Sequence, residues 1–350
     1  MYEPFYHLSG KPFQLSPDPS FFYESRVHRR GYAYLEYGLY QGEGFIVITG
    51  EVGAGKTILV RNLLNHINAD EVVAAHLVST QLDADDLLRA VAAALGLPVK
   101  GTDKASLLIE MEQFLRHIAA EGKHALLVVD EAQNLSPRAM EELRMLSNFQ
   151  VGGRALLQSF LVGQPGLRRT LQDPAMLQFR QRVIASYHLS PLDQSETQAY
   201  IQHRLRQVGW VGDPKLEDDA YAVIFAFTAG IPRRINLVCN RLLLAGFLNE
   251  KHVLDAADVE TVASEIREEL GIVGRPGEFT EAEENGREHR VRSGETSEVP
   301  TELDGPLEDL KYSARPAGLS QSNGSDLLAR VSRLENALAR LLSMLRRKSG

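Results

Sequence analysis

A glycine-rich stretch carries the clearest chemistry in this sequence. It fits the pattern G-x-x-x-x-G-K-[ST] at every fixed position, and its residues are Gly50, Glu51, Val52, Gly53, Ala54, Gly55, Lys56 and Thr57. The backbone N–H groups of such a loop point inward and bind phosphate oxygens. We therefore expect Lys56 to reach the β- and γ-phosphates of a nucleotide, and the Thr57 hydroxyl to contact Mg²⁺.

The segments on either side of this loop have the patterns that phosphate binding requires. Residues 45–49 are apolar and largely β-branched, which predicts a buried strand of a parallel sheet. Residues 58–67 carry apolar side chains at helical spacing. A strand, this loop and a helix place a bound anion at the helix N-terminus, where the helix dipole favours negative charge.

Two adjacent carboxylates follow the strongest strand pattern in the chain. Residues 125–129 form an apolar run that ends in Asp130 and Glu131. At the end of such a strand, Asp130 can hold Mg²⁺ through its water shell. Glu131 can polarise an attacking water as a general base. Together with the glycine-rich loop, this pair predicts nucleotide hydrolysis.

A polar residue follows a further predicted strand. Residues 156–162 are mostly apolar, and Gln164 comes directly after them and Gly163. If this strand neighbours the Asp130 strand, Gln164 lies beside the γ-phosphate. The alternative is a loop amide that caps a turn.

Three arginines are candidates for contact with phosphate. Arg180 and Arg182 precede a predicted strand over residues 184–189. They are either solvated charges or a finger that enters a neighbouring subunit's nucleotide site, and we favour a finger, with Arg182 ahead of Arg180. Arg233 lies in the first turn of a predicted helix, where the dipole disfavours a cation. It requires a partner, either a phosphate of the core site or a surface carboxylate.

The chain is expected to divide into five segments. They are an extended N-terminal segment (1–25), an α/β core that binds nucleotide (26–190), a helical lid domain (191–270), a disordered acidic linker (271–325) and a coiled-coil helix (326–348). The first segment is rich in aromatic residues and proline. We expect it to lie across the core, where it either contacts an adenine ring or packs without a ligand.

The last segment has a basic heptad pattern. Its leucines and one valine alternate spacings of three and four over residues 327–345. A short coiled coil that forms oligomers or docks a partner is the preferred interpretation. A helix on an anionic membrane surface is the second, and folding back onto the body of the protein is the third.

Composition sets limits on the class of protein. The 350 residues carry a net charge of −8, which argues against a surface that binds nucleic acid throughout. The single cysteine, Cys239, lies in an apolar helical pattern and is expected to be a buried thiol in a reducing compartment. We find no signal-peptide pattern and no run of 18 apolar residues, so a cytoplasmic protein is predicted.

Taken in order, these features predict the fold class. We expect an α/β P-loop NTPase of the AAA+ type, with a parallel sheet core, an additional strand between the two phosphate-site motifs and a C-terminal helical lid. No segment resembles the Asn-Lys-x-Asp guanine-binding motif, so ATP is the expected nucleotide.

The sequence also resembles a particular family, the ATPases related to general secretion pathway protein A. The resemblance is carried by residues 1–23, 44–57, 129–135 and 230–236. Two further stretches, residues 82–88 and 145–150, are similar to putative secretion ATPases of exosortase/PEP-CTERM exopolysaccharide loci.

The resemblance implies roles for particular residues and for the whole protein. It implies ATP at residues 50–57, Mg²⁺ at Thr57 and Asp130, and hydrolysis at Glu131. Gln164, Arg182 and Arg233 would be the sensor and finger positions. It further implies a ring-shaped homo-oligomer that energises or assembles an envelope export system, bound at the inner membrane through its C-terminal tail.

Two other functions remain open. The first is a DNA-directed ATPase of the transposition type, although the core is acidic and no helix-turn-helix pattern is present. The second is a scaffold that ATP switches without turnover.

Overall fold

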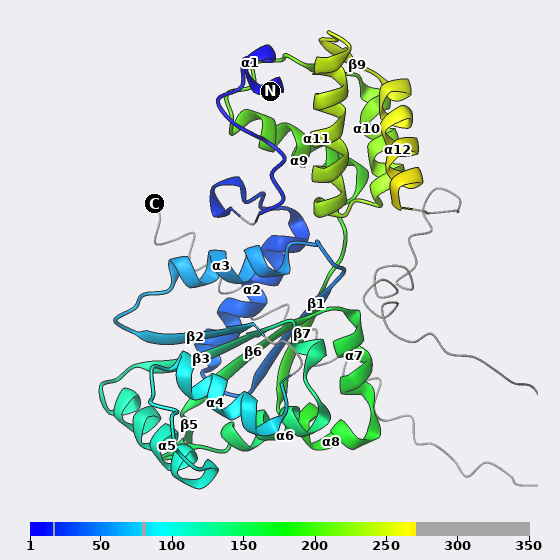
Figure 1. Ribbon diagram of the computed structural model, residues 1–350. Helices are drawn as coiled ribbons and strands as arrows, with labels where there is room; N and C mark the ends of the chain where they lie inside the picture. Colours follow the sequence, from blue (N-terminus) through cyan, green and yellow to red (C-terminus); the bar gives the residue numbers. More distant parts are fainter. Residues whose placement is uncertain (17, 79–81, 271–350) are drawn as a thin grey trace, which may run out of the picture. The chain divides into compact units, whose positions relative to one another are not determined.

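A five-stranded parallel sheet forms the core of the protein. The computed structural model describes residues 1–16, 18–78 and 82–270. The strand order in the sheet is β2-β3-β6-β1-β7 (Figure 1). The strands are β1 (Phe45–Gly50), β2 (Val72–Val78), β3 (His124–Asp130), β6 (Leu157–Gly163) and β7 (Val183–Leu189). Because β6 lies between β1 and β3, the predicted additional strand is confirmed.

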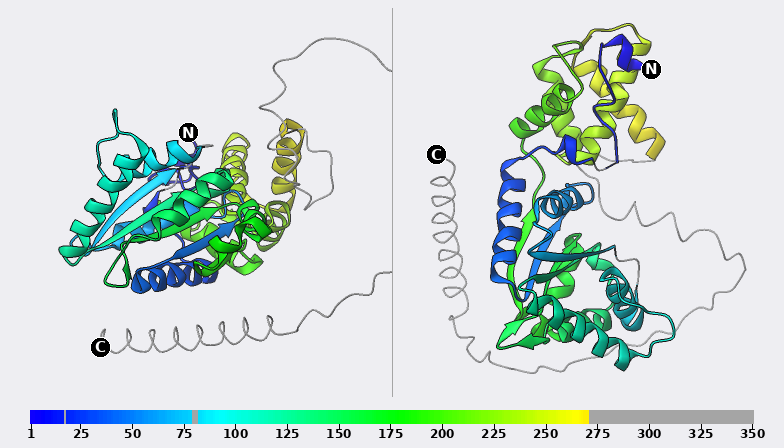
Figure 2. Two further views of the ribbon diagram at one scale, coloured as in Figure 1. Left: turned by 90° about the horizontal axis from the view of Figure 1, so that it is seen from below. Right: turned by 90° about the vertical axis from the view of Figure 1, so that its left-hand side faces the viewer.

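Both faces of the sheet are buried, which explains the continuous apolar runs in its central strands. Alternate residues of β1 point to opposite faces: Phe45 and Val47 pack into one core cluster, Ile46 and Ile48 into another. Figure 2 shows helices on both sides of the strands. Helices α2 (Arg26–Gln41) and α3 (Lys56–His66) cover one face. The other face is covered by α4 (Ala84–Ala94), α5 (Lys104–Ala120), α6 (Pro137–Leu146), α7 (Pro165–Gln172) and α8 (Leu177–Arg180).

Short elements connect the strands and helices of the core. A two-stranded antiparallel hairpin, β4 (Gln150–Val151) and β5 (Arg154–Ala155), precedes β6. Two 3-10 turns, η2 (Ala132–Asn134) and η3 (Pro174–Met176), follow β3 and α7.

A helical domain follows the sheet, as the sequence predicts. Its helices are α9 (Gln194–Arg206), α10 (Asp218–Thr228), α11 (Pro232–Leu248) and α12 (Ala256–Leu270). A capping box between Asp193 and Glu196 fixes the start of α9. Sequence patterns did not predict the parallel pair β8 (Lys215–Leu216) and β9 (Val253–Leu254), because two-residue strands show no periodicity. Cys239 is fully buried in the core of this domain, and burial raises the pKa of its thiol far above its ordinary value.

The N-terminal segment differs from the extended segment that the sequence predicts. It contains α1 (Tyr2–Phe5) and the 3-10 turn η1 (Pro19–Phe21), and its first part packs into the core of the lid domain. The Tyr2 hydroxyl donates to Asn240 Oδ1 at 2.7 Å, and the Tyr6 hydroxyl donates to the Lys251 carbonyl at 3.0 Å. The segment is therefore part of the lid core as well as a neighbour of the sheet.

The predicted acidic linker (271–325) and coiled-coil helix (326–348) lie outside the described residues. Within the described part of the chain, no helix combines the length and apolar character needed to cross a bilayer.

Candidate active site

The glycine-rich loop lies at the carboxyl end of β1, where ligands bind in open parallel sheets. Lys56 starts α3 and folds back over the loop, so that its ammonium donates to the carbonyls of Gly50 at 2.8 Å and Glu51 at 2.9 Å. The residue is 6% exposed, and burial lowers the pKa of the amine, although Glu131 and Asp130 oppose the shift. A buried cation over a loop of N–H groups is suited to bind a phosphate.

A hydroxyl and a carboxylate meet at the start of α3. Thr57 Oγ1 donates to Asp130 Oδ2 at 2.7 Å, and Asp130 is the last residue of β3. The other carboxylate oxygen accepts from the Glu131 amide at 2.9 Å. Hard oxygen atoms of this kind are the ligands that Mg²⁺ prefers, and they fit the expected magnesium position.

Glu131 is held by two glutamines. Its backbone is left-handed, with φ of 53°, which turns the chain sharply after β3. Gln133 Nε2 donates to Glu131 Oε2 at 2.6 Å, and Gln164 Nε2 donates to the same oxygen at 3.3 Å. Gln133 Oε1 also accepts from the backbone N–H of Gln164 at 2.9 Å, so the three side chains are connected to one another by hydrogen bonds.

The neighbouring positions of β3 and β6 explain why Gln164 reaches this carboxylate. Val129 pairs with Leu161, so both strands end at the same edge of the sheet. The sequence singled out Gln164 but not Gln133, although the position of Gln133 two residues after Glu131 was a usable signal.

The lid domain touches the glycine-rich loop directly. The amide of Arg233, in the first turn of α11, donates to the Gly53 carbonyl at 3.2 Å. A Cβ atom added to Gly53 would lie 2.3 Å from the Arg233 Cβ, so only glycine permits this approach. Arg233 also lines the same cavity as Lys56, Thr57 and Glu131.

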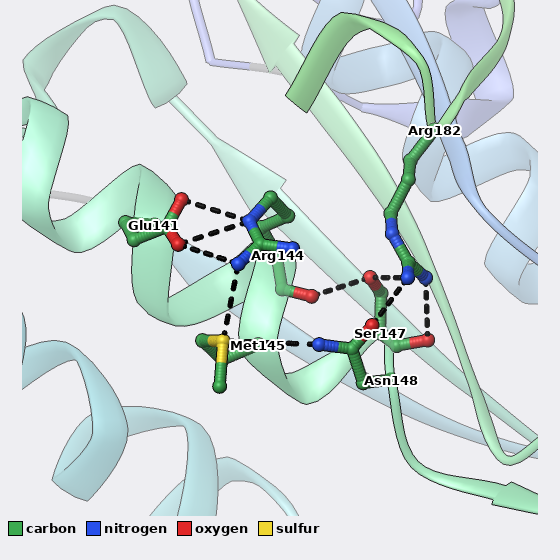
Figure 3. Close-up of polar contacts among 6 residues, drawn as sticks. All are labelled: Glu141, Arg144, Met145, Ser147, Asn148 and Arg182. Carbon is green, nitrogen blue, oxygen red and sulfur yellow. Dashed lines mark hydrogen bonds and ion pairs between the residues drawn. The ribbon is translucent and has the colours of Figure 1, made fainter. Parts of the chain in front are cut away.

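The structure does not bring Arg180 and Arg182 to the site of their own chain. The Arg182 carbonyl accepts from the amide of Phe45, which places it at the amino end of the sheet, opposite the glycine-rich loop. Its guanidinium donates to the Ser147 carbonyl at 3.1 Å and to the side chains of Ser147 and Asn148 (Figure 3). Arg180 donates to the Leu171 carbonyl at 2.8 Å. A finger role for either arginine therefore requires a second copy of the chain.

Sequence patterns missed a buried histidine below the loop. His28 Nδ1 lies 2.7 Å from the hydroxyl of Ser25, the N-cap of α2. The ring also forms a hydrogen bond with the Ala54 backbone, and a Cβ on Gly55 would lie 2.6 Å from His28 Nε2. Burial lowers the pKa of His28 to about 4, so the ring is neutral at physiological pH.

The cavity above the loop has three walls. The glycine-rich loop and Glu131 form one, α9 and α11 of the lid form the second, and the N-terminal segment forms the third. The lid contributes Arg204, which is 6% exposed and which sequence patterns also missed. Residues of the N-terminal segment, which the sequence predicts either to contact an adenine ring or to pack without a ligand, line this cavity.

The fold and the site together define the class of protein. Residues 39–171 match the family model described as AAA domain. The ORC2 protein of Aeropyrum pernix, solved as ADPNP–ADP complexes, matches with a TM-score of 0.53 and 17% identity, over 70% of this chain and 71% of that one. CDC6P from Pyrobaculum aerophilum matches with a TM-score of 0.53 and 18% identity, over 71% of each chain. The chain is a nucleotide-binding protein of the AAA+ class.

A closer relative narrows the family. General secretion pathway protein A of Aeromonas hydrophila is 38% identical over 268 residues, which cover 76% of this chain and 48% of the relative. The chain thus spans about half the length of that protein. It carries an AAA domain and is related, over most of its own length, to general secretion pathway protein A.

Proposed function

We propose that this protein binds ATP with Mg²⁺ and hydrolyses it to ADP and phosphate. The observation that carries the proposal is the position of Glu131. Its carboxylate shares one cavity with Lys56 and Arg233, and it follows directly on the Asp130 carboxylate that Thr57 contacts. A general base beside a phosphate loop is the arrangement that water attack on a γ-phosphate requires.

Each residue has a distinct role in this proposal. Residues 50–57 bind the phosphates, and Lys56 releases the Gly50 and Glu51 carbonyls to contact the β- and γ-phosphates. Thr57 and Asp130 hold Mg²⁺, which neutralises phosphate charge when it is bound. Glu131 accepts a proton from the attacking water. Gln164, which already contacts Glu131, and Arg233 on the lid contact the γ-phosphate.

The substitution Glu131→Gln tests the proposal. An amide of nearly the same shape cannot accept a proton, so turnover should fall by at least about 100-fold, in the range seen for lost acid–base catalysis. Affinity for ATP should stay close to that of the wild type, because Glu131 does not hold the phosphates. The matched control is Glu268→Gln at an exposed position of α12, which should leave both quantities unchanged. Wild-type turnover in Glu131→Gln would refute the proposal.

We further propose that hydrolysis occurs in a homo-oligomeric ring. Support comes from Arg182, which lies at the far end of the sheet from its own loop but is half-exposed. A neighbouring copy would receive this guanidinium at its γ-phosphate, where it stabilises charge in the transition state.

The cellular role that we propose is envelope export. The similarity to general secretion pathway protein A supports it, and the exopolysaccharide loci named above are the narrower candidate. The protein would act in the cytoplasm and attach to an export complex at the inner membrane through its tail. Host cells that carry only Glu131→Gln should stop exporting the client while they still assemble the complex. Normal export in those cells would refute this role.

A further inference from the structure

One buried cation in the wall of the cavity takes no part in the roles above. Arg204 lies on α9, and its guanidinium bonds to main-chain carbonyls of the N-terminal segment. Its Nε donates to the Pro12 carbonyl at 2.6 Å, and its Nη2 donates to the Gln14 carbonyl at 3.4 Å. The guanidinium also lies over the Phe21 ring, 4.8 Å from its centroid. A planar guanidinium can donate to two carbonyls of one segment at fixed angles in this way, whereas the single ammonium of a lysine cannot.

The segment that Arg204 holds forms the third wall of the cavity. We call it the strap and define it as residues 12–16 and 18–23. Gln14, Ser16, Phe21 and Phe22 of the strap line the cavity, and Lys56 lines its phosphate end. Aromatic faces with polar groups beside them are the surfaces on which a flat heteroaromatic ring binds. The strap thus offers the base side of a nucleotide site.

Arg204 also connects the strap to the lid helix that touches the glycine-rich loop. Its Nη1 donates to the Tyr200 hydroxyl at 2.9 Å, and that hydroxyl donates to Asn236 Oδ1 at 2.8 Å. Asn236 lies on α11 one turn after Arg233, whose amide bonds to the Gly53 carbonyl. A continuous set of hydrogen bonds therefore joins the strap, α9 and α11 at the edge of the phosphate site.

We propose that Arg204 is a positioning residue that fixes the strap as the nucleobase wall and ties it to α11. This inference rests on the proposed function, since it assumes that the cavity takes a purine nucleotide. It follows that affinity for the base depends on Arg204, whereas affinity for the phosphates does not. A merely structural residue would change both affinities together.

Calorimetric titration of the full-length chain with two ligands tests this inference. In the presence of Mg²⁺, ADP reports the base and the phosphates, and inorganic pyrophosphate reports the phosphates alone. Arg204→Ala should weaken ADP binding by at least about tenfold, the size of a lost charged hydrogen bond, and leave pyrophosphate binding within about twofold of the wild type. Arg204→Lys keeps the charge but not the fork, and should lose an intermediate factor for ADP alone.

Two further variants complete the design. Arg206→Ala removes the same group from an exposed position of α9, where it donates to Gln202 Oε1 at 3.0 Å, and should change neither affinity. Phe21→Ala removes the aromatic contact of the strap with Arg204, and should also weaken ADP binding selectively. If Arg204→Ala does not fold, Arg204→Lys and Phe21→Ala decide the matter by the same comparison.

Several results would overturn the inference. Equal losses for ADP and pyrophosphate in Arg204→Ala would assign it a role in charge or folding, and unchanged ADP affinity would assign it none. If the wild type binds pyrophosphate as tightly as ADP, the strap is not a nucleobase wall, and the proposal of ATP hydrolysis is unaffected. A wild type that binds neither ligand would refute both.

Discussion

Glu131 receives hydrogen bonds from two glutamine side chains, and the shorter one comes from Gln133 at 2.6 Å. Gln133 also accepts from the Gln164 amide, so it connects the proposed base with the proposed sensor. This contact should orient the Glu131 carboxylate toward water rather than bind nucleotide. A substitution of Gln133 should therefore lower turnover without changing the affinity for nucleotide.

We expect Gln133→Ala to lower kcat by about tenfold, the value of one hydrogen bond to a charged group, with KM nearly unchanged. Steady-state kinetics with ATP measures both quantities. The exposed Gln172 at the end of α7 is the matched control, and Gln172→Ala should match the wild type. An unchanged kcat in Gln133→Ala would mean that Glu131 is oriented without it.

His28 gives the protein a predictable pH dependence. Its pKa is about 4 in the folded chain, chiefly because it is buried, against 6.5 as its ordinary value. Between these two values the unfolded chain binds a proton that the folded chain does not. Stability therefore falls as pH drops from about 6.5 to about 4, by about 3 kcal/mol if His28 acts alone.

Urea unfolding of the wild type and His28→Gln across this pH range measures that contribution. The variant should be less stable at pH 7, since it loses the Ser25 and Ala54 contacts, but its stability should fall less on acidification. The exposed His66→Gln should keep the wild-type slope. Parallel slopes for wild type and His28→Gln would contradict the assignment.

At the scale of elements, the approach of α11 to the glycine-rich loop depends on Gly53. Its φ of 78° and the 2.3 Å distance from an added Cβ to the Arg233 Cβ are two separate reasons for glycine. Gly209 has a φ of 81° with nothing within 4 Å of an added Cβ, so it isolates the first reason.

Both Gly53→Ala and Gly209→Ala should lose about 1–2 kcal/mol of stability from backbone strain. Only Gly53→Ala should also displace the start of α11, and a displacement of this size should lower ATP turnover by at least about tenfold. Thermal unfolding and ATPase rate, measured on both variants, separate the two effects. Equal turnover in the two variants would show that the lid contact is dispensable.

The elements of the sheet could be predicted from sequence because each is a continuous local pattern. Residues 45–49 and 125–129 are apolar runs followed by recognisable motifs, and their strands are present. His28 and Arg204 could not be predicted in the same way. Each has a main-chain partner far away in the sequence, the Ala54 backbone for His28 and the Pro12 carbonyl for Arg204, and no spacing records such a contact.

The position of the N-terminal segment was also beyond local patterns. Its aromatic residues predict burial but do not say against which element. Tyr2 and Tyr6 pack into the lid domain, more than 190 residues away in the sequence, where their hydroxyls bond to Asn240 and Lys251. The apolar character of an aromatic side chain predicts that it is buried, whereas the element that buries it depends on the topology of the fold.

At the scale of the whole molecule, the proposed ring makes each site depend on two subunits. A mixture of Glu131→Gln and Arg182→Ala protomers tests this dependence. Each variant alone should be inactive, but the mixture should regain activity, because one protomer supplies Arg182 to the intact Glu131 of the other. No recovery in a mixture that still assembles would place Arg182 outside the mechanism. Arg154→Ala, at an exposed position of β5, is the control and should be active alone.

Removal of residues 326–350 is the second test at the scale of the whole molecule. If the predicted coiled coil promotes assembly, a chain that lacks them should show a lower average mass at a given concentration, and a lower rate per subunit. Light scattering and ATPase assays on the same samples measure both. Full assembly and full turnover without these residues would leave the tail with a docking role only.

The most direct test of the central claim is the ATPase rate per subunit as a function of protein concentration, for the wild type and Glu131→Gln. The account predicts a wild-type rate that rises with concentration as subunits assemble, and a Glu131→Gln rate at background throughout. A flat rate near background that does not depend on Glu131 would contradict the account and leave a nucleotide-binding scaffold.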